Sequence, residues 1–283
     1  MNLSWVVFVV IYSALKSSRD CMKKASLKIS SLYEVLFFYT LTGLIFALPF
    51  SADAFSLPPK LIFLVFVKSA VVCLAWFFSC LALGKMSVSL YGIIDLSRVV
   101  FSMLMGVFFL GESMTAAKAV GALLVITGLM LVNMKKSTCA TETTAMAVVA
   151  SFLCCFFNSV SGTMDKALMK HMTSSQLQFW FMLFMTAIYG VALIANREKA
   201  SFTNLKRNYW IPLMSLSLVL GDRLLFEANA SPDSEVTVMT VIKQSSVVFT
   251  VLLGKLVFEE KNILYKLFCC GIVLCGIFIA IFM

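Results

Sequence analysis

The sequence predicts an all-α integral membrane protein whose ten transmembrane helices form two inverted five-helix repeats. Three observations predict this fold: 61% of the residues are apolar, the apolar stretches are long enough to cross a bilayer, and the two halves of the chain resemble each other. Only 13% of the residues are charged, whereas a soluble domain carries roughly 25%. With a mean hydropathy of +0.97, most of the surface is expected to face lipid.

The apolar stretches have the length of membrane spans. A helix needs about 20 apolar residues to cross a hydrocarbon core of about 30 Å. Ten such spans would use about 200 residues, which leaves no connection long enough to hold a catalytic domain. The expected spans are 3–22, 31–50, 60–82, 87–110, 114–134, 145–168, 175–195, 208–229, 235–258 and 262–282.

The first span differs from a secretory signal peptide. A signal peptide carries its positive charges before the apolar run, whereas here they follow it. We therefore interpret the first span as a retained helix. The basic residues after it are Lys16, Arg19, Lys23, Lys24 and Lys28.

Composition also argues against several classes of function. The net charge of +9 comes from basic residues in connections between spans, with no aromatic-basic module, so no nucleic-acid partner is expected. The nine cysteines form no Cys-x-x-Cys pair and His171 is the only histidine, so no metal or other cofactor is expected. The chain contains no Gly-x-Ser-x-Gly motif, and we expect no enzyme activity.

The two halves of the chain carry an internal duplication. A shift of 148 residues places SRVVF (97–101) on SSVVF (245–249), and KASLK (24–28) resembles KALMK (166–170) at a slightly different offset. Because each copy has an odd number of spans, the second copy must enter the membrane from the opposite face. Inverted pairs of this kind are typical of secondary transporters, whose substrate sites lie where the repeats meet. The expected repeats are residues 1–136 and 145–283.

These motifs resemble those of the ten-helix EamA-type branch of the drug/metabolite transporter superfamily. The resemblance rests on the five-plus-five layout, on GVFFLGES (106–113) and GKLVFEEK (254–261), and on the two Lys-rich segments described above. It implies a secondary carrier of small metabolites with alternating access to a central cavity. The proline that the family often carries early in the fourth and ninth helices is absent, so substrates are not transferred from relatives. That neighbourhood holds Asp95, Arg98, Lys243 and Gln244.

Charged residues inside the fourth span point to a functional interior. If this helix begins near Ser87, Asp95 lies about 12 Å along it, close to the bilayer centre. A charge at that depth costs about 3 kcal/mol and usually faces the bundle interior or a wet cavity. Arg98, three residues on, and Tyr91, four residues before, share its face.

Other spans place polar or aromatic residues at comparable depths. The duplication makes Lys243 the equivalent of Asp95, and the eighth span contributes Asp222, Arg223 and Glu227. We expect the acids to hold a cationic group of the substrate, the bases an anionic group, and the aromatic rings an apolar or cation–π wall. The predicted substrate-binding residues are Glu34, Trp76, Tyr91, Asp95, Arg98, Asp222, Arg223, Glu227, Lys243 and Gln244.

The same charges have a structural interpretation. Asp95 could pair with Arg98 or Lys243 and only hold helices together. Paired buried charges are seldom more stabilising than apolar packing, and this favours a functional role. Two further charged sites are expected at the periphery: Lys68 would extend toward an interface, and Asp165 with Lys166 would form a pair at the rim.

The sequence therefore predicts a secondary active transporter of a small polar or zwitterionic metabolite, resembling an amino acid or an amine, with membrane lipid around it. Coupling to a proton or a counter-solute is consistent with acids in a cavity of low dielectric. An exporter of hydrophobic organic cations and a non-transporting membrane scaffold are the alternatives. We expect the protein in the cytoplasmic membrane of a prokaryote.

The orientation of the chain stays open at this stage. Most Lys and Arg residues follow odd-numbered spans, and the positive-inside rule then places both termini outside the cytoplasm. The family resemblance implies the opposite, with both termini in the cytoplasm.

Overall fold

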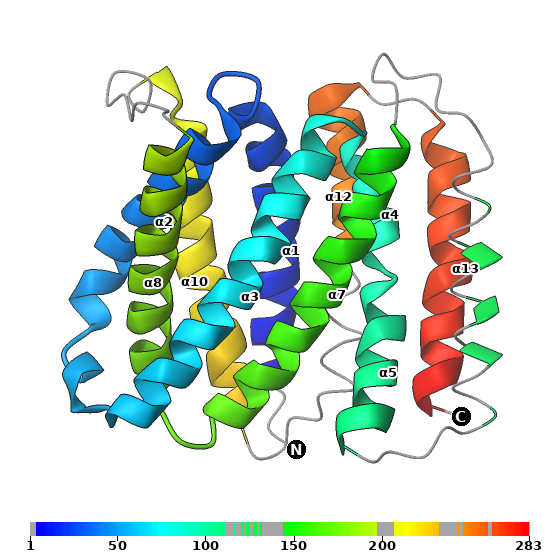
Figure 1. Ribbon diagram of the computed structural model, residues 1–283. Helices are drawn as coiled ribbons and strands as arrows, with labels where there is room; N and C mark the ends of the chain where they lie inside the picture. The colour runs from blue at the N-terminus through cyan, green and yellow to red at the C-terminus, as the bar shows by residue number, and fades with distance from the viewer. Residues whose placement is uncertain are drawn as a thin grey trace.

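The computed structural model is an all-helical bundle within the residues that it describes (Figure 1). Four of its helices, Leu32–Phe50, Pro59–Gly84, Ala145–Asp165 and Ser174–Ala195, are long and apolar enough to cross a membrane. The predicted class of a helical membrane protein is thus confirmed, while the count of ten spans stays a prediction. The described residues are 4–110, 116, 120–121, 123–124, 127–128, 131, 144–196, 207–231, 243, 246–259 and 262–282.

The helices overlap the expected spans. The first half of the chain forms α1 (Ser4–Ser26), α2 (Leu32–Ala47), α3 (Pro59–Gly84), α4 (Val88–Asp95) and α5 (Arg98–Leu110), with two short 3-10 turns, η1 (Leu48–Phe50) and η2 (Ala54–Ser56), before α3. The second half forms α7 (Ala145–Leu168), α8 (Ser174–Ala195), α10 (Trp210–Ala230), α12 (Ser246–Phe258) and α13 (Ile263–Phe282). Helices α1, α3, α8 and α10 extend one to four residues beyond the expected ends. Most of the expected span 114–134 lies outside the described residues.

Hydroxyl side chains fix where several helices begin. Ser31, Ser87 and Thr144 each accept a hydrogen bond from the backbone N–H three residues later. Thr173 does the same at α8, and Oε1 of Gln176 accepts a hydrogen bond from the backbone N–H of Thr173. Such caps satisfy amide groups that the first helical turn leaves without a partner.

The fourth span is broken, contrary to the single helix expected over 87–110. α4 ends at Asp95, α5 begins at Arg98, and Leu96 with Ser97 forms a turn. The backbone N–H groups of Leu96, Ser97 and Val99 bond to carbonyls three residues earlier, so the backbone tightens locally from the α to the 3-10 pattern. The break places the two charged residues at the facing ends of two short helices.

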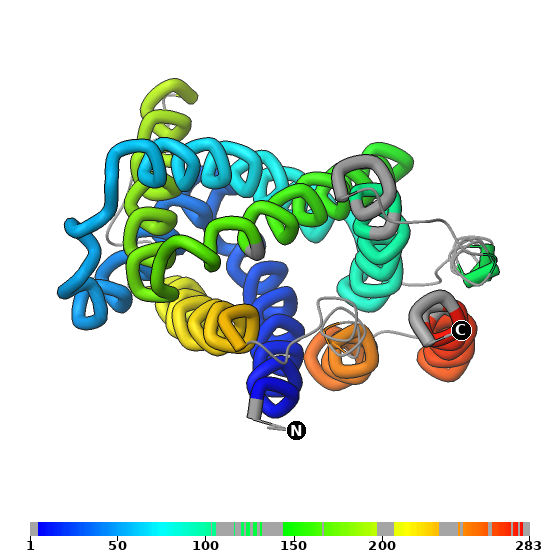
Figure 2. The backbone as a smooth tube through the Cα atoms, turned by 90° about the horizontal axis from the view of Figure 1, so that it is seen from below, coloured from blue at the N-terminus to red at the C-terminus, as the bar shows by residue number. Residues whose placement is uncertain are grey.

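Helices from the two halves interleave. α1 packs against α10 and α12, and α3 packs against α7; Figure 2 shows α1 between α10 and α12, with α3 and α7 side by side. In Figure 1, α1 rises from the N-terminus whereas α7 descends. The first helix of each half therefore lies against the third helix of the other half, and these first helices run in opposite directions.

A close contact holds α4 against α12. A Cβ atom added at Gly92 would lie 2.8 Å from Cγ2 of Thr250 and 3.6 Å from Cγ2 of Val247. Small residues allow helices in a membrane to approach this closely. The contact fixes α4, and with it Tyr91 and Asp95, against the second half of the chain.

Candidate functional site

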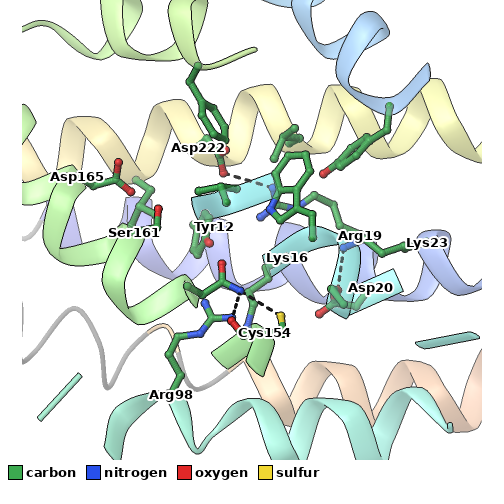
Figure 3. Close-up of a pocket in the computed structure, with 18 of the residues that line it drawn as sticks. Tyr12, Lys16, Arg19, Asp20, Lys23, Arg98, Cys154, Ser161, Asp165 and Asp222 are labelled. Atoms are coloured by element: carbon green, nitrogen blue, oxygen red, sulfur yellow. Dashed lines mark hydrogen bonds and ion pairs between the residues drawn. The ribbon is translucent and has the colours of Figure 1, made fainter. Parts of the chain in front are cut away.

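A cavity of about 130 Å³ lies between helices of both halves (Figure 3). We call it the charged cavity, because eight of its lining side chains are basic or acidic. Its walls come from α1, α2, α3, α4, α5, α7, α8 and α10. The lining residues are Tyr12, Lys16, Arg19, Asp20, Lys23, Tyr39, Lys68, Val72, Trp76, Ser79, Tyr91, Arg98, Cys154, Asn158, Ser161, Asp165, Phe181, Leu218, Asp222, Leu225 and Phe226.

One face of α1 supplies more charge to the charged cavity than any other helix in the described part of the chain. Tyr12, Lys16, Arg19, Asp20 and Lys23 recur at intervals of three and four residues, which is the spacing of one helical face. Each of the last four is joined to another helix or points into the cavity (Figure 3). α1 is therefore an amphipathic helix whose polar side faces the protein interior.

Two bases share a single carboxylate at the break between α4 and α5. Asp95 accepts a hydrogen bond from Nη2 of Arg98 at 2.6 Å and forms an ion pair with Nζ of Lys16. The thiol of Cys155 approaches the same carboxylate at 3.7 Å. Because the Asp95 side chain is only 5% exposed, these contacts are needed to compensate for the loss of its hydration. The cluster leaves one net positive charge.

Two further ion pairs join the halves of the chain. Nη1 of Arg19 on α1 lies 3.3 Å from Oδ1 of Asp222 on α10. Lys68 on α3 is paired with Asp165 on α7. Both pairs connect the first helix of one half with the third helix of the other, with the base on the first helix in one pair and on the third helix in the other.

The expectation that Lys68 extends to a membrane interface is wrong. Its side chain is 2% exposed, and Nζ lies 4.3 Å from the ring centroid of Phe181 and 5.1 Å from that of Phe226. Lys68 faces inward because α3 turns this side toward α7 and α10, where Asp165 supplies the opposite charge. Asp165 is thus part of the charged cavity, whereas a rim pair with Lys166 was expected.

Aromatic rings form an apolar wall beside these charges. The ring centroid of Trp76 lies 5.0 Å from that of Tyr39 and 6.0 Å from that of Phe181. Nζ of Lys23 lies 6.0 Å from the Trp76 ring, within the range of a cation–π contact. The cavity therefore offers both ionic groups and an aromatic surface to a solute.

The charged cavity brings together some of the predicted substrate-binding residues. Trp76, Tyr91, Arg98 and Asp222 line it. Asp95 is not itself among the lining residues. Its carboxylate is connected to the charged cavity through the ion pair with Arg98. The expected pairing of Asp95 with Arg98 is confirmed by their hydrogen bond, although the two residues lie on the separate helices α4 and α5 and not on one continuous helix.

Other predicted residues lie outside the lining. Glu34 is buried in the first turn of α2, and the guanidinium of Arg223 lies 4.3 Å from the ring centroid of Phe50. Oε1 of Glu227 accepts a hydrogen bond of 2.5 Å from Ser174. Lys243 is partly buried and is not among the lining residues, and Gln244 lies outside the described residues.

Sequence reasoning missed the charged face of α1. The basic segment 16–28 was counted with the connections between spans, although the helix continues to Ser26. The signal was present in the three- and four-residue spacing of Lys16, Arg19 or Asp20, and Lys23. A helix with this spacing buries its charged face in a membrane protein, since lipid accepts only the apolar side.

The chemistry open to this site is ionic recognition. Among the described residues no three His, Cys, Asp or Glu side chains gather into a metal-binding group. The lining groups are instead ammonium, guanidinium, carboxylate, hydroxyl and aromatic groups, which bind a polar solute through charge, hydrogen bonds and stacking.

The structure is thus a helical membrane bundle with a charged, partly aromatic cavity in its interior. The model of the EamA-like transporter family matches the chain twice, over residues 3–134 and 145–282. The chain therefore belongs to the EamA-like transporter family, within the drug/metabolite transporter superfamily, and its class is that of a membrane transporter.

Solved structures support the fold. One crystal structure, described only as that of a protein, aligns with a TM-score of 0.68 at 16% identity, covering 99% of this chain and 97% of its own. At this identity the similarity concerns the fold alone. No curated protein matches the chain significantly.

Proposed function

We infer that the protein is a secondary active transporter that moves a small polar or zwitterionic metabolite across a membrane by alternating access. One observation carries this proposal: basic and acidic side chains from both halves converge on one cavity between the helices. A purely structural core would be at least as stable with apolar residues of similar volume. Retaining so many ionic groups is explained if water and a charged solute enter between the halves.

Alternating access requires two halves that move against each other around a fixed site. The helix pairs α1–α10 and α3–α7 provide contacts between the halves, and each carries an ion pair at the charged cavity. The opposite directions of α1 and α7 support an inverted pair of repeats, 1–136 and 145–283, crossing the membrane as ten helices. In such pairs the substrate site lies between the repeats.

The charge of the cavity favours a polar metabolite over a hydrophobic cation. Five bases line it against three acids, and Asp95 raises the acids to four. This surplus of positive charge repels organic cations, whereas it accommodates a solute that carries an anionic group. We propose a proton or a counter-solute as the coupled species and the cytoplasmic membrane of a prokaryote as the location.

The proposal is tested by counterflow in proteoliposomes that contain the purified full-length chain. Vesicles loaded with a library of small amino acids, amines and organic acids are offered each labelled compound in turn. We expect saturable uptake of at least one polar compound above that of protein-free vesicles. Absence of uptake for every compound, with the protein shown to be folded and inserted, would refute the proposal.

A charge-balanced variant links that transport to the charged cavity. Asp95→Asn combined with Lys16→Met removes one acid and its paired base, so the net charge is unchanged. We expect the double variant to fold and to lose most of the uptake. Asp53→Asn, which changes an exposed acid in the connection between α2 and α3, is the control and should transport normally.

A further inference from the structure

Two charged residues that line the charged cavity take part in none of the ion pairs described above. Asp20 and Lys23 are the charged lining residues with no oppositely charged group at ion-pair distance in the described part of the chain. The lining residues that ion pairs do account for are Lys16, Arg19, Lys68, Arg98, Asp165 and Asp222, together with Asp95 behind them.

Both residues are deeply buried and face the same space. Asp20 is 8% exposed and Lys23 is 7% exposed. They lie three residues apart on α1, hence on one helical face, and both line the charged cavity (Figure 3). A buried charge without an ion-pair partner is unfavourable, and the hydrogen bond from Lys23 to Ser79 compensates only part of this cost. A bound solute that carries opposite charges would supply the missing ion-pair partners of Asp20 and Lys23.

Hydrogen bonds around Lys23 define an anion-binding corner. Nζ of Lys23 donates to Oγ of Ser79 at 3.1 Å, and the hydroxyl of Tyr91 donates to the same oxygen at 2.8 Å. A serine oxygen has two acceptor sites and one O–H donor. Since both acceptor sites are used, the Ser79 O–H and the remaining N–H bonds of Lys23 are available as donors to a carboxylate.

A chain of hydrogen bonds holds this corner in place. Nδ2 of Asn158 donates two hydrogen bonds to Cys154, one to its carbonyl oxygen at 2.8 Å and one to its sulfur at 3.1 Å. The Cys154 thiol lies 3.4 Å from the hydroxyl oxygen of Tyr91. With the thiol as the donor in this contact, the Tyr91 O–H donates its hydrogen bond to Ser79. Linked donors of this kind polarise one another in one direction, here toward the Ser79 hydroxyl.

We propose that Asp20, Lys23 and Ser79 form the binding site for an amino-acid zwitterion. The substrate carboxylate accepts hydrogen bonds from Lys23 and Ser79, and the substrate ammonium group pairs with Asp20. Trp76, beside Lys23, contacts the carbon skeleton. The cavity volume of about 130 Å³ is close to that of a cavity that holds benzene, so small side chains fit best in this conformation. This assignment rests on the proposed function and names its substrate class.

Ligand chemistry provides the first test. The purified full-length protein is titrated with each of the twenty common amino acids, and with the methyl ester and the N-acetyl derivative of each that binds. The ester removes the carboxylate charge and the N-acetyl group removes the ammonium charge. We expect at least one free amino acid to bind and both of its derivatives to bind roughly tenfold more weakly or worse.

Variants assign each charge of the ligand to its residue. Asp20→Asn should weaken the free amino acid about tenfold or more while leaving the N-acetyl derivative unchanged, because only the ammonium contact is lost. Lys23→Met and Ser79→Ala should do the reverse, weakening the free amino acid and leaving the methyl ester unchanged. Asp53→Asn and Lys85→Met, at exposed positions outside the charged cavity, are the matched controls.

Several results would overturn the assignment. The assignment is wrong if no free amino acid binds, or if the methyl ester and the N-acetyl derivative bind as tightly as the parent amino acid. It is also wrong if Asp20→Asn and Lys23→Met weaken all ligands equally, whichever charges the ligands carry. Loss of folding in Asp20→Asn would show that Asp20 is a structural partner and would equally overturn it. Transport of another library compound in the counterflow assay, unaffected by these variants, would refute this site while the proposed function stands.

Discussion

Arg19 of α1 and Asp222 of α10 form a buried ion pair between the two halves of the chain, with 3.3 Å between Nη1 and Oδ1. Their side chains are 9% and 14% exposed, so neither charge is well hydrated. A second pair, Lys68 with Asp165, joins α3 to α7 in the same way. A movement that separates α1 from α10, or α3 from α7, therefore disturbs the ion pair between them. A movement that keeps each of these helix pairs together leaves its ion pair unchanged.

The first prediction concerns the Arg19–Asp222 pair. Asp222→Asn leaves a buried guanidinium without its partner, and removal of one member of such a pair costs about 3–5 kcal/mol of folding free energy. We expect a clear fall in the melting temperature of the purified protein. Arg19→Met with Asp222→Leu removes both charges and should recover most of the loss. A double variant no more stable than Asp222→Asn would contradict the pairing.

The second prediction separates the three members of the cluster at the helix break. Asp95 compensates both Lys16 and Arg98, so Asp95→Asn leaves two buried bases close together. Arg98→Met leaves the Lys16–Asp95 pair intact. We expect Asp95→Asn to lower the melting temperature much more than Arg98→Met. Equal effects would show that Lys16 does not depend on Asp95.

The third prediction concerns the contact between α4 and α12. A methyl group at Gly92 would lie 2.8 Å from Cγ2 of Thr250, a side chain whose branching leaves it little freedom. Gly92→Ala should cost about 1–3 kcal/mol through overpacking. Adding Thr250→Ala should relieve most of the cost, because it removes the methyl group at 2.8 Å and leaves only the Cβ atom of residue 250, at 3.1 Å. Gly84→Ala is the control, since a Cβ atom there meets nothing within 4 Å.

Parts of this site could be predicted from the sequence because they depend on local spacing. Asp95 and Arg98 are three residues apart, and this short separation keeps their side chains close even though the expected helix is broken between them. The hydrogen bond between them confirms that they pair. The partner of Asp95 from α1, Lys16, is 79 residues away. No local pattern specifies which helix packs there, so the sequence suggested Lys243 from the duplication.

Neighbouring residues in one span show the same limit. Asp222 and Arg223 were both predicted to bind substrate, but successive residues of a helix point about 100° apart. Asp222 faces the charged cavity, whereas Arg223 lies over the ring of Phe50. Periodicity identifies the two faces of α10, and only the packing of α10 against α1 and α2 determines which face meets the cavity.

The last prediction uses the thiol of Cys154 as a reporter of access to the charged cavity. Cys154 lines the cavity but is only 1% exposed, so a small methanethiosulfonate reagent reaches it only when the halves separate. We expect slow labelling of Cys154, measured by mass spectrometry of its peptide, and slower labelling when a transported solute is present.

Cys269 is equally buried but lies outside the lining, and it is the internal control. Labelling of Cys269 as fast as Cys154 would indicate general loosening of the bundle. No labelling of Cys154 during turnover would mean that water does not enter between α1, α3 and α7, and alternating access at this cavity would be wrong.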